Sequence, residues 1–118
     1  MVVVPFPFSD LSATKRRPVV CLVDVGSRDW VTCQVTTNAY ADPAAFPLAA
    51  ADFASGGLRA ASYVRPGKLF TIDAALMTSV AGYLTDAAVV RVLAAVAQLF
   101  QPSAATVRPA APLGPGSP

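Results

Sequence analysis

Apolar residues recur at helical spacing in one long segment of this chain, and that segment comes near the end. The residues that set the spacing are Val89, Val92, Leu93, Val96 and Phe100. Thr85 or Asp86 can cap the start of this helix, because either side-chain oxygen can accept from the free amides of the first turn. Pro102 ends it. The apolar segments before it are short, which predicts a mainly β fold, a small curled sheet or barrel that ends in one helix.

The strand pattern is clearest in the first third of the chain. Residues 2–8 alternate between two faces, but two prolines lie among them and cannot donate to ladders on both sides, which predicts an edge strand. Residues 18–25 are apolar on both faces, as is typical of a central buried strand. Residues 30–37 alternate, and Thr36 falls on the more polar face, where a ligand can reach it. We also expect a turn at 26–29 and weaker strands at 46–53, 61–65, 69–72 and 77–80.

The cations gather at two places. Residues 9–17 form a polar segment, predicted to be a loop, which ends in Lys15, Arg16 and Arg17 directly before Pro18. Cations held beside a rigid strand can grip a phosphate, although position alone favours an ordinary solvated loop. The net charge of +2 is too small to indicate nucleic-acid binding by itself. The second group of cations is Arg59, Arg65 and Lys68.

Composition bounds the class of protein. A chain of 118 residues fits one domain, which can bury a core without a disulfide or a metal. Hydrophobic residues make up 54% and charged residues 14%, and this apolar balance predicts an oligomer that hides part of its surface. Cys21 and Cys33 lack metal-ligand spacing and the chain has no His to support them, so we expect reduced core thiols in a cytosolic protein.

Three further observations bear on location and on domain limits. The N-terminus has no cationic region ahead of its apolar residues, so we do not expect a signal peptide. The longest apolar run, 87–99, is too short to span a bilayer, so we expect a cytoplasmic protein that does not bind membranes. Residues 102–118 hold five of the eleven prolines, which predicts a disordered tail after a domain of residues 1–101.

Four segments resemble, in order and at similar spacing, the PemK/MazF family of type II toxin–antitoxin systems. They cover residues 4–18, 33–37, 56–71 and 82–86, and the first and third are long enough to be specific. The resemblance implies an SH3-like small barrel with a C-terminal helix, working as a homodimer. It also implies an endoribonuclease, or mRNA interferase, that cleaves single-stranded RNA selectively and is neutralised by a cognate antitoxin.

The resemblance also implies which residues form the site. The family's catalytic Arg falls on Arg17 and its catalytic Thr on Thr36, while relatives often carry Asp where this chain has Gly67. The implied reaction uses no metal or cofactor: the ribose 2′-hydroxyl attacks its own phosphate and leaves a cyclic phosphate and a free 5′-hydroxyl. The chain has no His, so protons must move through another group or water. The residues expected to contact RNA are Lys15, Arg16, Arg59, Arg65 and Lys68.

Several alternatives stay open at this point. Some relatives use the Arg that falls on Arg65 in catalysis, but a structural salt bridge is an equal alternative for it. A non-enzymatic gyrase poison like CcdB shares the fold, and Arg17 followed by Pro18 together with Thr36 favours the nuclease over it. A decayed toxin that only binds its antitoxin is a third reading, favoured by Gly67 and by a first strand that starts close to Met1. For the antitoxin we expect an acidic segment that lies over the basic residues.

Overall fold

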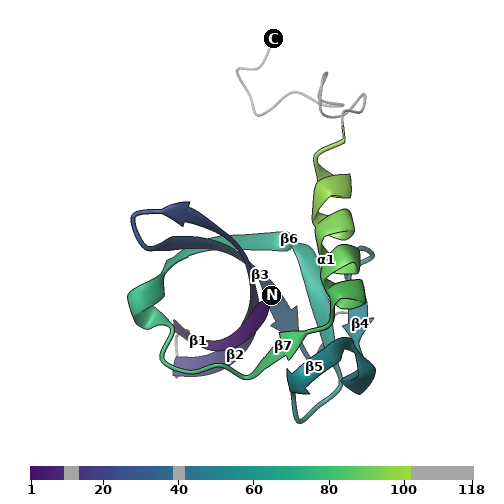
Figure 1. The fold of residues 1–118 in the computed structure, drawn as a ribbon, viewed down its shortest axis with the longest axis horizontal. Coiled ribbons are helices and arrows are strands. Elements are labelled where there is room, and N and C mark those ends of the chain that lie inside the picture. Colours follow the sequence, from purple (N-terminus) through teal and green to yellow (C-terminus); the bar gives the residue numbers. More distant parts are fainter. Residues whose placement is uncertain (10–13, 39–41, 102–118) are drawn as a thin grey trace, which may run out of the picture.

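The computed structural model describes residues 1–9, 14–38 and 42–101, and the side chains of residues 6–9, 14 and 15 are not described. These residues form seven strands, two short 3₁₀ helices and one α-helix (Figure 1). Their bounds are β1 Val2–Ser9, β2 Thr14–Gly26, β3 Asp29–Thr36, β4 Phe46–Leu48, η1 Ala50–Asp52, β5 Phe53–Gly56, β6 Ser62–Asp73, η2 Ala74–Leu76, β7 Gly82–Leu84 and α1 Asp86–Leu99.

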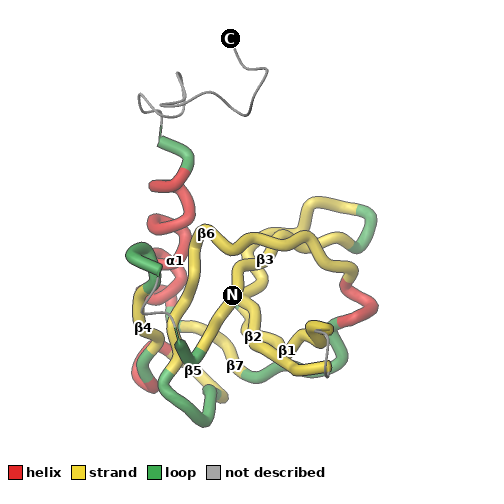
Figure 2. The backbone as a smooth tube through the Cα atoms, turned by 180° about the vertical axis from the view of Figure 1, so that it is seen from behind, coloured by secondary structure: helices red, strands yellow, loops and turns green. Residues whose placement is uncertain are grey.

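The strands form one antiparallel sheet in the order β4-β6-β3-β2-β1-β7-β5. The two edge strands, β4 and β5, are joined directly through η1, so the sheet has to curl until its edges approach each other. Both backbone views show the curled sheet, with α1 beside β4 and β5 at one side and η2 at the opposite side (Figures 1 and 2). The predicted mainly β, barrel-like fold with a C-terminal helix is confirmed.

Alternation along the strands gives the sheet two apolar faces. One face joins buried residues of the strands to Ala88 and Val92 of α1, and Val3, Val20 and Cys33 belong to it. The opposite face holds a smaller cluster whose buried members are Val4, Val19, Cys21 and Ile72. Neighbouring residues in a strand point to opposite sides, so both faces receive apolar side chains from β1 and β2.

Both thiols are free and buried, as predicted. They lie on opposite faces of the sheet, Cys33 in the larger cluster and Cys21 in the smaller one. Burial raises the pKa of Cys33 to about 12 and also raises the pKa of Cys21. Both groups are therefore neutral core thiols at physiological pH, and neither is a reactive nucleophile.

The prediction that residues 2–8 form an edge strand was wrong. β1 lies between β2 and β7 in the sheet. β7 pairs only with Val2 and Val3, however, whereas β2 pairs with the whole of β1. Pro5 and Pro7 therefore lie where the strand has a ladder on one side only, which is the physical requirement that prolines impose on a sheet.

The central strand is longer and less buried than expected. β2 lies between β1 and β3, but its buried residues end at Cys21, while Val23 and Val25 are exposed. Beyond Cys21 the pairing with β3 shifts register twice, and the hairpin extends past the core. The predicted turn closes it, with Ser27 and Arg28 at positive φ of 53° and 67°.

The second half of the sheet differs from the prediction in how the segments join. Residues 61–65 and 69–72 belong to one strand, β6, which bends at a bulge opposite Cys33 and Gln34. The range 46–53 is divided by η1 into β4 and the start of β5. Residues 77–80 are not a strand; the next strand is β7.

The C-terminal helix begins where the cap signal placed it. The Thr85 hydroxyl accepts from the amide of Ala88 at 3.2 Å, so Thr85 rather than Asp86 is the cap. Arg91 fastens the helix to the closing edge of the sheet: Nη1 donates to Asp52 Oδ1 at 2.7 Å and Nη2 donates to the Pro47 carbonyl at 3.2 Å. The same guanidinium lies 5.6 Å from the centroid of the Phe46 ring.

In the portion of the chain that the structure describes, no helix is long and apolar enough to cross a membrane. The predicted tail, residues 102–118, lies outside the described residues, and the limit of the domain at residue 101 stays a prediction.

Candidate functional site

Arg17 and Thr36 are brought together by the register of β2 and β3. Val19 pairs with Gln34, so Arg17, two residues before Val19, and Thr36, two residues after Gln34, belong to the same face of neighbouring antiparallel strands. Both line one pocket of about 250 Å³. The full lining is Arg16, Arg17, Pro18, Val35, Thr36 and Thr37.

The local structure around Arg17 differs from the expected loop. Residues 14–17 are part of β2, because they continue the ladder with β1: Phe6 pairs with Arg17 and Pro7 with Arg16. Only residues 10–13 of the predicted loop lie outside the described structure. Arg17 is half-buried, Arg16 is exposed, and within the described ranges neither forms an ion pair. A strand anchors the Arg17 backbone, and in the part of the chain that the structure describes no group accepts from its guanidinium, so its donors can meet a ligand.

Thr36 is only 8% exposed, and its hydroxyl already has local partners. Oγ1 accepts from the amide of Asn38 at 3.2 Å and donates to the Asn38 carbonyl at 3.3 Å. This turn fixes the hydroxyl at the end of β3, in the wall of the pocket. To donate to a ligand, the hydroxyl must rotate away from the Asn38 carbonyl, whereas it can accept a second hydrogen bond without doing so.

Arg65 lies next to this pair on β6. It pairs with Gln34, and Thr36 pairs with Tyr63 two residues away, so Arg65 is diagonal to Thr36 on the same face. Its Nε donates to Asp42 Oδ2 at 2.8 Å and its Nη1 donates to Gln34 Oε1 at 3.2 Å. The salt bridge considered for Arg65 is therefore present.

Asp42 and Gln34 are residues of this site that the sequence analysis did not single out. The Arg65 hydrogen bond is the main cause that holds the pKa of Asp42 below its usual value, with burial acting in the opposite direction. Gln34 is buried, and it lies within the segment 33–37 that carries Thr36. In the sequence, the only sign that Gln34 belongs to the site was its position two residues before Thr36. The pairing of its strand with the strand of Arg65 could not be known.

The other expected contact residues are spread around the molecule. Lys68 is exposed and lies within the bulge of β6, between Arg65 and Leu69, and the side chain of Lys15 is not described. Arg59 lines a different pocket of about 500 Å³, formed by β4, η1, β5 and residues 57–63. The structure thus brings Arg16, Arg17 and Thr36 into one pocket, sets Arg65 beside them, and leaves Arg59 apart.

Gly67 is not required by its surroundings. Among the described residues, a Cβ at this position would have one neighbour within 4 Å, a methyl group of Leu99 at 3.9 Å, which is an ordinary contact. A side chain would therefore fit at position 67, so the packing does not explain why this chain has Gly there.

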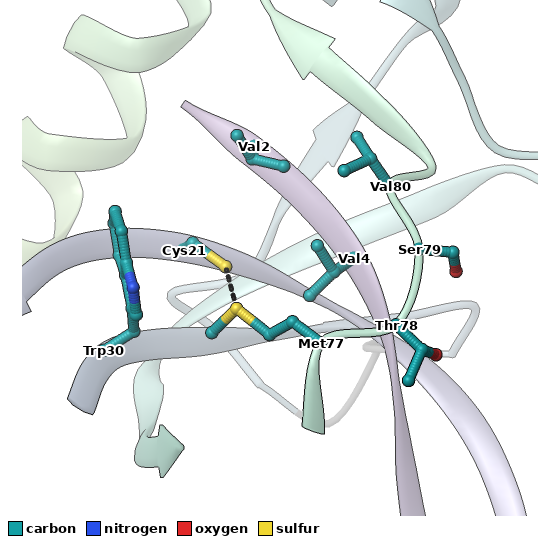
Figure 3. Close-up of a pocket in the computed structure, with 8 residues that line it drawn as sticks. All are labelled: Val2, Val4, Cys21, Trp30, Met77, Thr78, Ser79 and Val80. Carbon is teal, nitrogen blue, oxygen red and sulfur yellow. Dashed lines mark hydrogen bonds between the residues drawn. The ribbon is translucent and has the colours of Figure 1, made fainter. Parts of the chain in front are cut away.

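A second, apolar pocket lies on the face of β2 that carries Arg17. Arg17, Val19 and Cys21 alternate onto the same face, and Cys21 lies in the wall of a pocket of about 260 Å³ (Figure 3). Cys21 Sγ and Met77 Sδ are 3.8 Å apart, and Trp30 stands at one side of them. The lining is Val2, Val4, Cys21, Trp30, Met77, Thr78, Ser79 and Val80.

Metal-ligating side chains do not gather at this site. Among the described residues, no group of three or more His, Cys, Asp or Glu is placed to hold a metal ion. The donors that converge on the pocket are a guanidinium and a hydroxyl, which suit an anionic oxygen.

A family model of the PemK-like, MazF-like toxins of type II toxin–antitoxin systems matches residues 1–100. The chain belongs to this family. The resemblance inferred from the four sequence segments is thereby confirmed, and the chain is a toxin of this type. No curated protein sequence matches it.

Solved structures of the family have the same fold. The toxin MazF-mt6 of Mycobacterium tuberculosis is 18% identical, with a TM-score of 0.66 over 85% of this chain and 96% of that one. MazF in a MazE–MazF structure from Deinococcus radiodurans is 18% identical, with a TM-score of 0.67 over 86% and 94%. An endoribonuclease from a mycobacterial species, in complex with its cognate antitoxin, is 20% identical, with a TM-score of 0.62 over 86% and 92%.

Proposed function

We propose that this toxin is a metal-independent endoribonuclease that cleaves mRNA in the cytoplasm and that a cognate antitoxin neutralises it. The observation that carries the proposal is the pocket in which Arg17 and Thr36 meet on neighbouring strands. The family and the similar mycobacterial endoribonuclease support it.

Arg17 suits the chemistry of phosphodiester cleavage. As the 2′-hydroxyl loses its proton and its oxygen bonds to phosphorus, the bond to the 5′-oxygen breaks and that oxygen takes up a proton. The intermediate phosphorane carries extra negative charge on its non-bridging oxygens. A guanidinium presents paired donors to these oxygens, and in a half-buried pocket such donors stabilise the charge far better than in water.

Thr36 would orient the reacting ribose. Its hydroxyl is held at the pocket wall by the amide of Asn38, and it can accept a hydrogen bond from the 2′-hydroxyl while that bond remains. Because the chain contains no His, another group or water carries the protons in this scheme.

Three variants test these assignments in single-turnover cleavage of a defined RNA with end-group analysis. Arg17→Lys keeps the charge but loses the paired donors, so the rate should fall by about 10²–10³-fold with little change in RNA affinity. Thr36→Val removes only the hydroxyl. Arg16→Ala, one residue away and exposed, is the matched control and should weaken binding and flatten its salt dependence.

The outcome separates this proposal from its rivals. Equal rates for Arg17→Lys and the parent would move the catalytic site away from this pocket. If the parent cleaves no RNA, a gyrase poison or a decayed toxin becomes the better reading, and gyrase binding or antitoxin binding then distinguishes the two.

We also infer a homodimer and an acidic antitoxin segment. Large apolar side chains are exposed on the β2–β3 hairpin and on the last turns of α1, and burying them in a second copy would remove them from water. Light scattering that gives a monomer at micromolar concentration would contradict the dimer. The exposed cations Arg16, Arg59 and Lys68 suit an acidic competitor, whose binding should weaken as salt rises.

A further inference from the structure

We propose that Asp42 is a positioning residue for RNA cleavage, because it holds the Arg65 guanidinium beside Thr36 at the edge of the Arg17 pocket. This inference rests on the proposed function and adds to it a residue that acts through another side chain.

The Asp42 carboxylate is fixed by its own turn before it meets Arg65. The Asp42 carbonyl accepts from the amide of Ala45 at 3.1 Å, and Asp42 Oδ1 accepts from the amide of Ala44 at 3.0 Å. Asp at the first position of a turn followed by Pro43 is the arrangement that favours both bonds. One carboxylate oxygen is therefore occupied by the backbone, which leaves the other oxygen oriented toward Arg65.

Arg65 is then held at two points from two different segments. Asp42 Oδ2 accepts from Nε at 2.8 Å, and Gln34 Oε1 accepts from Nη1 at 3.2 Å. Gln34 is itself buried in β3, directly opposite Arg65 on β6. A long side chain with two such partners loses most of its rotational freedom. This loss of conformational entropy occurs on folding, so RNA binding does not have to order the side chain.

The hold leaves part of the guanidinium available. Within the described ranges, no protein group accepts from Arg65 Nη2, and the Arg65 side chain keeps 33% of its surface exposed. Since Arg65 is diagonal to Thr36, these donors lie at the edge of the site where a phosphate of the bound RNA would pass. Positioned donors of this kind stabilise charge in a transition state because they need no reorganisation.

A carboxylate near bound RNA would by itself repel phosphate. A positioning role and a purely electrostatic role for Asp42 therefore predict opposite effects on the cleavage rate. If Asp42 only neutralised Arg65, its removal would raise both RNA affinity and rate. If Asp42 positions Arg65, its removal leaves RNA affinity unchanged or higher, yet the cleavage rate falls.

The test is single-turnover cleavage of a defined RNA at saturating and subsaturating enzyme by the parent, Asp42→Ala, Arg65→Ala and the double variant. Asp42→Ala should lower the saturated rate by about tenfold without weakening RNA binding. In the Arg65→Ala background the same substitution should have no further effect, because the residue acts only through Arg65. Asp42→Asn has only one acceptor oxygen, and when that oxygen accepts from Ala44, the amide nitrogen faces Arg65 Nε and cannot accept from it. Its rate should therefore fall as far as that of Asp42→Ala, and it keeps the test valid if alanine disturbs the turn.

Asp52→Asn is the matched control, because Asp52 forms the other short Arg–Asp pair of the described residues and is not one of the residues that line the Arg17 pocket. It should leave the rate per folded molecule unchanged. A saturated rate for Asp42→Ala equal to or above the parent's would overturn the proposal, and so would an equal loss in the Arg65→Ala background.

A second measurement separates this inference from the proposed function. In nitrogen-15 NMR, the Nε–H of Arg65 should exchange slowly with water in the parent and in Asp52→Asn, and quickly in Asp42→Ala. Fast exchange in the parent would overturn the hold on Arg65 whatever the enzyme does. Slow exchange in a parent that cleaves no RNA would overturn the proposed function and, with it, the catalytic meaning of the pair.

Discussion

Two Arg–Asp pairs of nearly equal length have different surroundings in this molecule. Arg91 meets Asp52 at 2.7 Å and Arg65 meets Asp42 at 2.8 Å. Each carboxylate also accepts from a backbone amide close to it in sequence, at Ala49 and at Ala44 respectively. The pKa of each carboxyl is lowered, for Asp52 mainly by the Ala49 amide and for Asp42 mainly by the Arg65 side chain.

The two arginines differ in what occupies the rest of the guanidinium. Arg91 also donates to the Pro47 carbonyl and lies over the Phe46 ring, so its remaining contacts are with the protein it fastens. Arg65 has Gln34 as its second partner and keeps Nη2 donors without an acceptor in the described chain. The same pair of side chains is thus a structural clamp in one place and a candidate part of a site in the other.

The largest effect that sharpens this comparison is expected at Arg65. Arg65→Ala should lower the single-turnover cleavage rate by about 10²-fold, since it removes positioned donors from the site. The free energy of unfolding should change by less than about 1 kcal/mol, because a partly exposed ion pair contributes little. Chemical denaturation and cleavage of the same preparation measure both. A large loss of stability with an unchanged cleavage rate would show that the Arg65–Asp42 pair is structural, like the Arg91–Asp52 pair.

Arg91→Ala should show the opposite pattern. It removes the ion pair, the bond to Pro47 and the contact with Phe46 that join α1 to the closing edge of the sheet. We expect a loss of about 1–2 kcal/mol in the free energy of unfolding, since the guanidinium is half-exposed and each contact is modest. The cleavage rate per folded molecule should equal the parent's. A lower rate would show that the Arg91 contacts also affect the geometry of the Arg17 pocket.

A smaller effect is expected at the start of the same helix. Thr85→Ala removes the hydroxyl that accepts from Ala88, and loss of such a cap costs about 1 kcal/mol. Combined with Arg91→Ala, the losses should add, because the Thr85 hydroxyl and the Arg91 guanidinium have different hydrogen-bond partners, and the bond from the Thr85 amide to the Asp52 carbonyl is kept in both variants. Urea titration of both single variants and the double variant checks this; a double variant no less stable than Arg91→Ala would show that the clamp alone holds α1.

The smallest effect is expected from acid. The pKa values of Asp42 and Asp52 are lower in the folded state than in the unfolded chain, where an Asp titrates near about 3.9. Their contribution to stability is therefore present above that pH and is lost as the pH falls through the folded values. Between about pH 5 and pH 2, Asp52→Asn and Asp42→Asn should each lose less stability than the parent. If the free energy of unfolding of a variant and of the parent fell in parallel with pH, that ion pair would not contribute to the stability of the fold.

Several elements could be predicted from the sequence because their causes are local. The cap at Thr85, the end of the helix before Pro102 and the turn at 26–29 depend on residues a few positions apart. The alternation that puts Thr36 on the more polar face of its strand also depends only on the strand itself, but the expectation that this face leaves Thr36 accessible was wrong, since Thr36 is only 8% exposed. The motifs around Arg17 and Arg65 were long enough to identify the family.

The partner of each strand could not be obtained in this way. The prolines of β1 correctly indicated that one side of the strand is unpaired where they lie. They did not show that β7 would pair with Val2 and Val3 on that same side, before the prolines. Residues 61–65 and 69–72 have separate patterns, and only their shared pairing with β3 makes them one strand with a bulge. Residues 14–17 look polar and loop-like, yet β1 supplies a ladder that holds them in β2.

The sequence by itself therefore determined the family, the mainly β composition of the domain, the position of the closing helix and the choice of Arg17 and Thr36 as candidates. The tertiary structure alone decided that these two share a pocket, that Asp42 reaches Arg65 across 23 positions, and that Arg91 closes the sheet edge. The physical reason is that helix caps, turns and alternation follow from neighbouring residues. Register and ion pairing instead depend on which distant backbone satisfies each strand, and that choice is made only when the whole sheet folds.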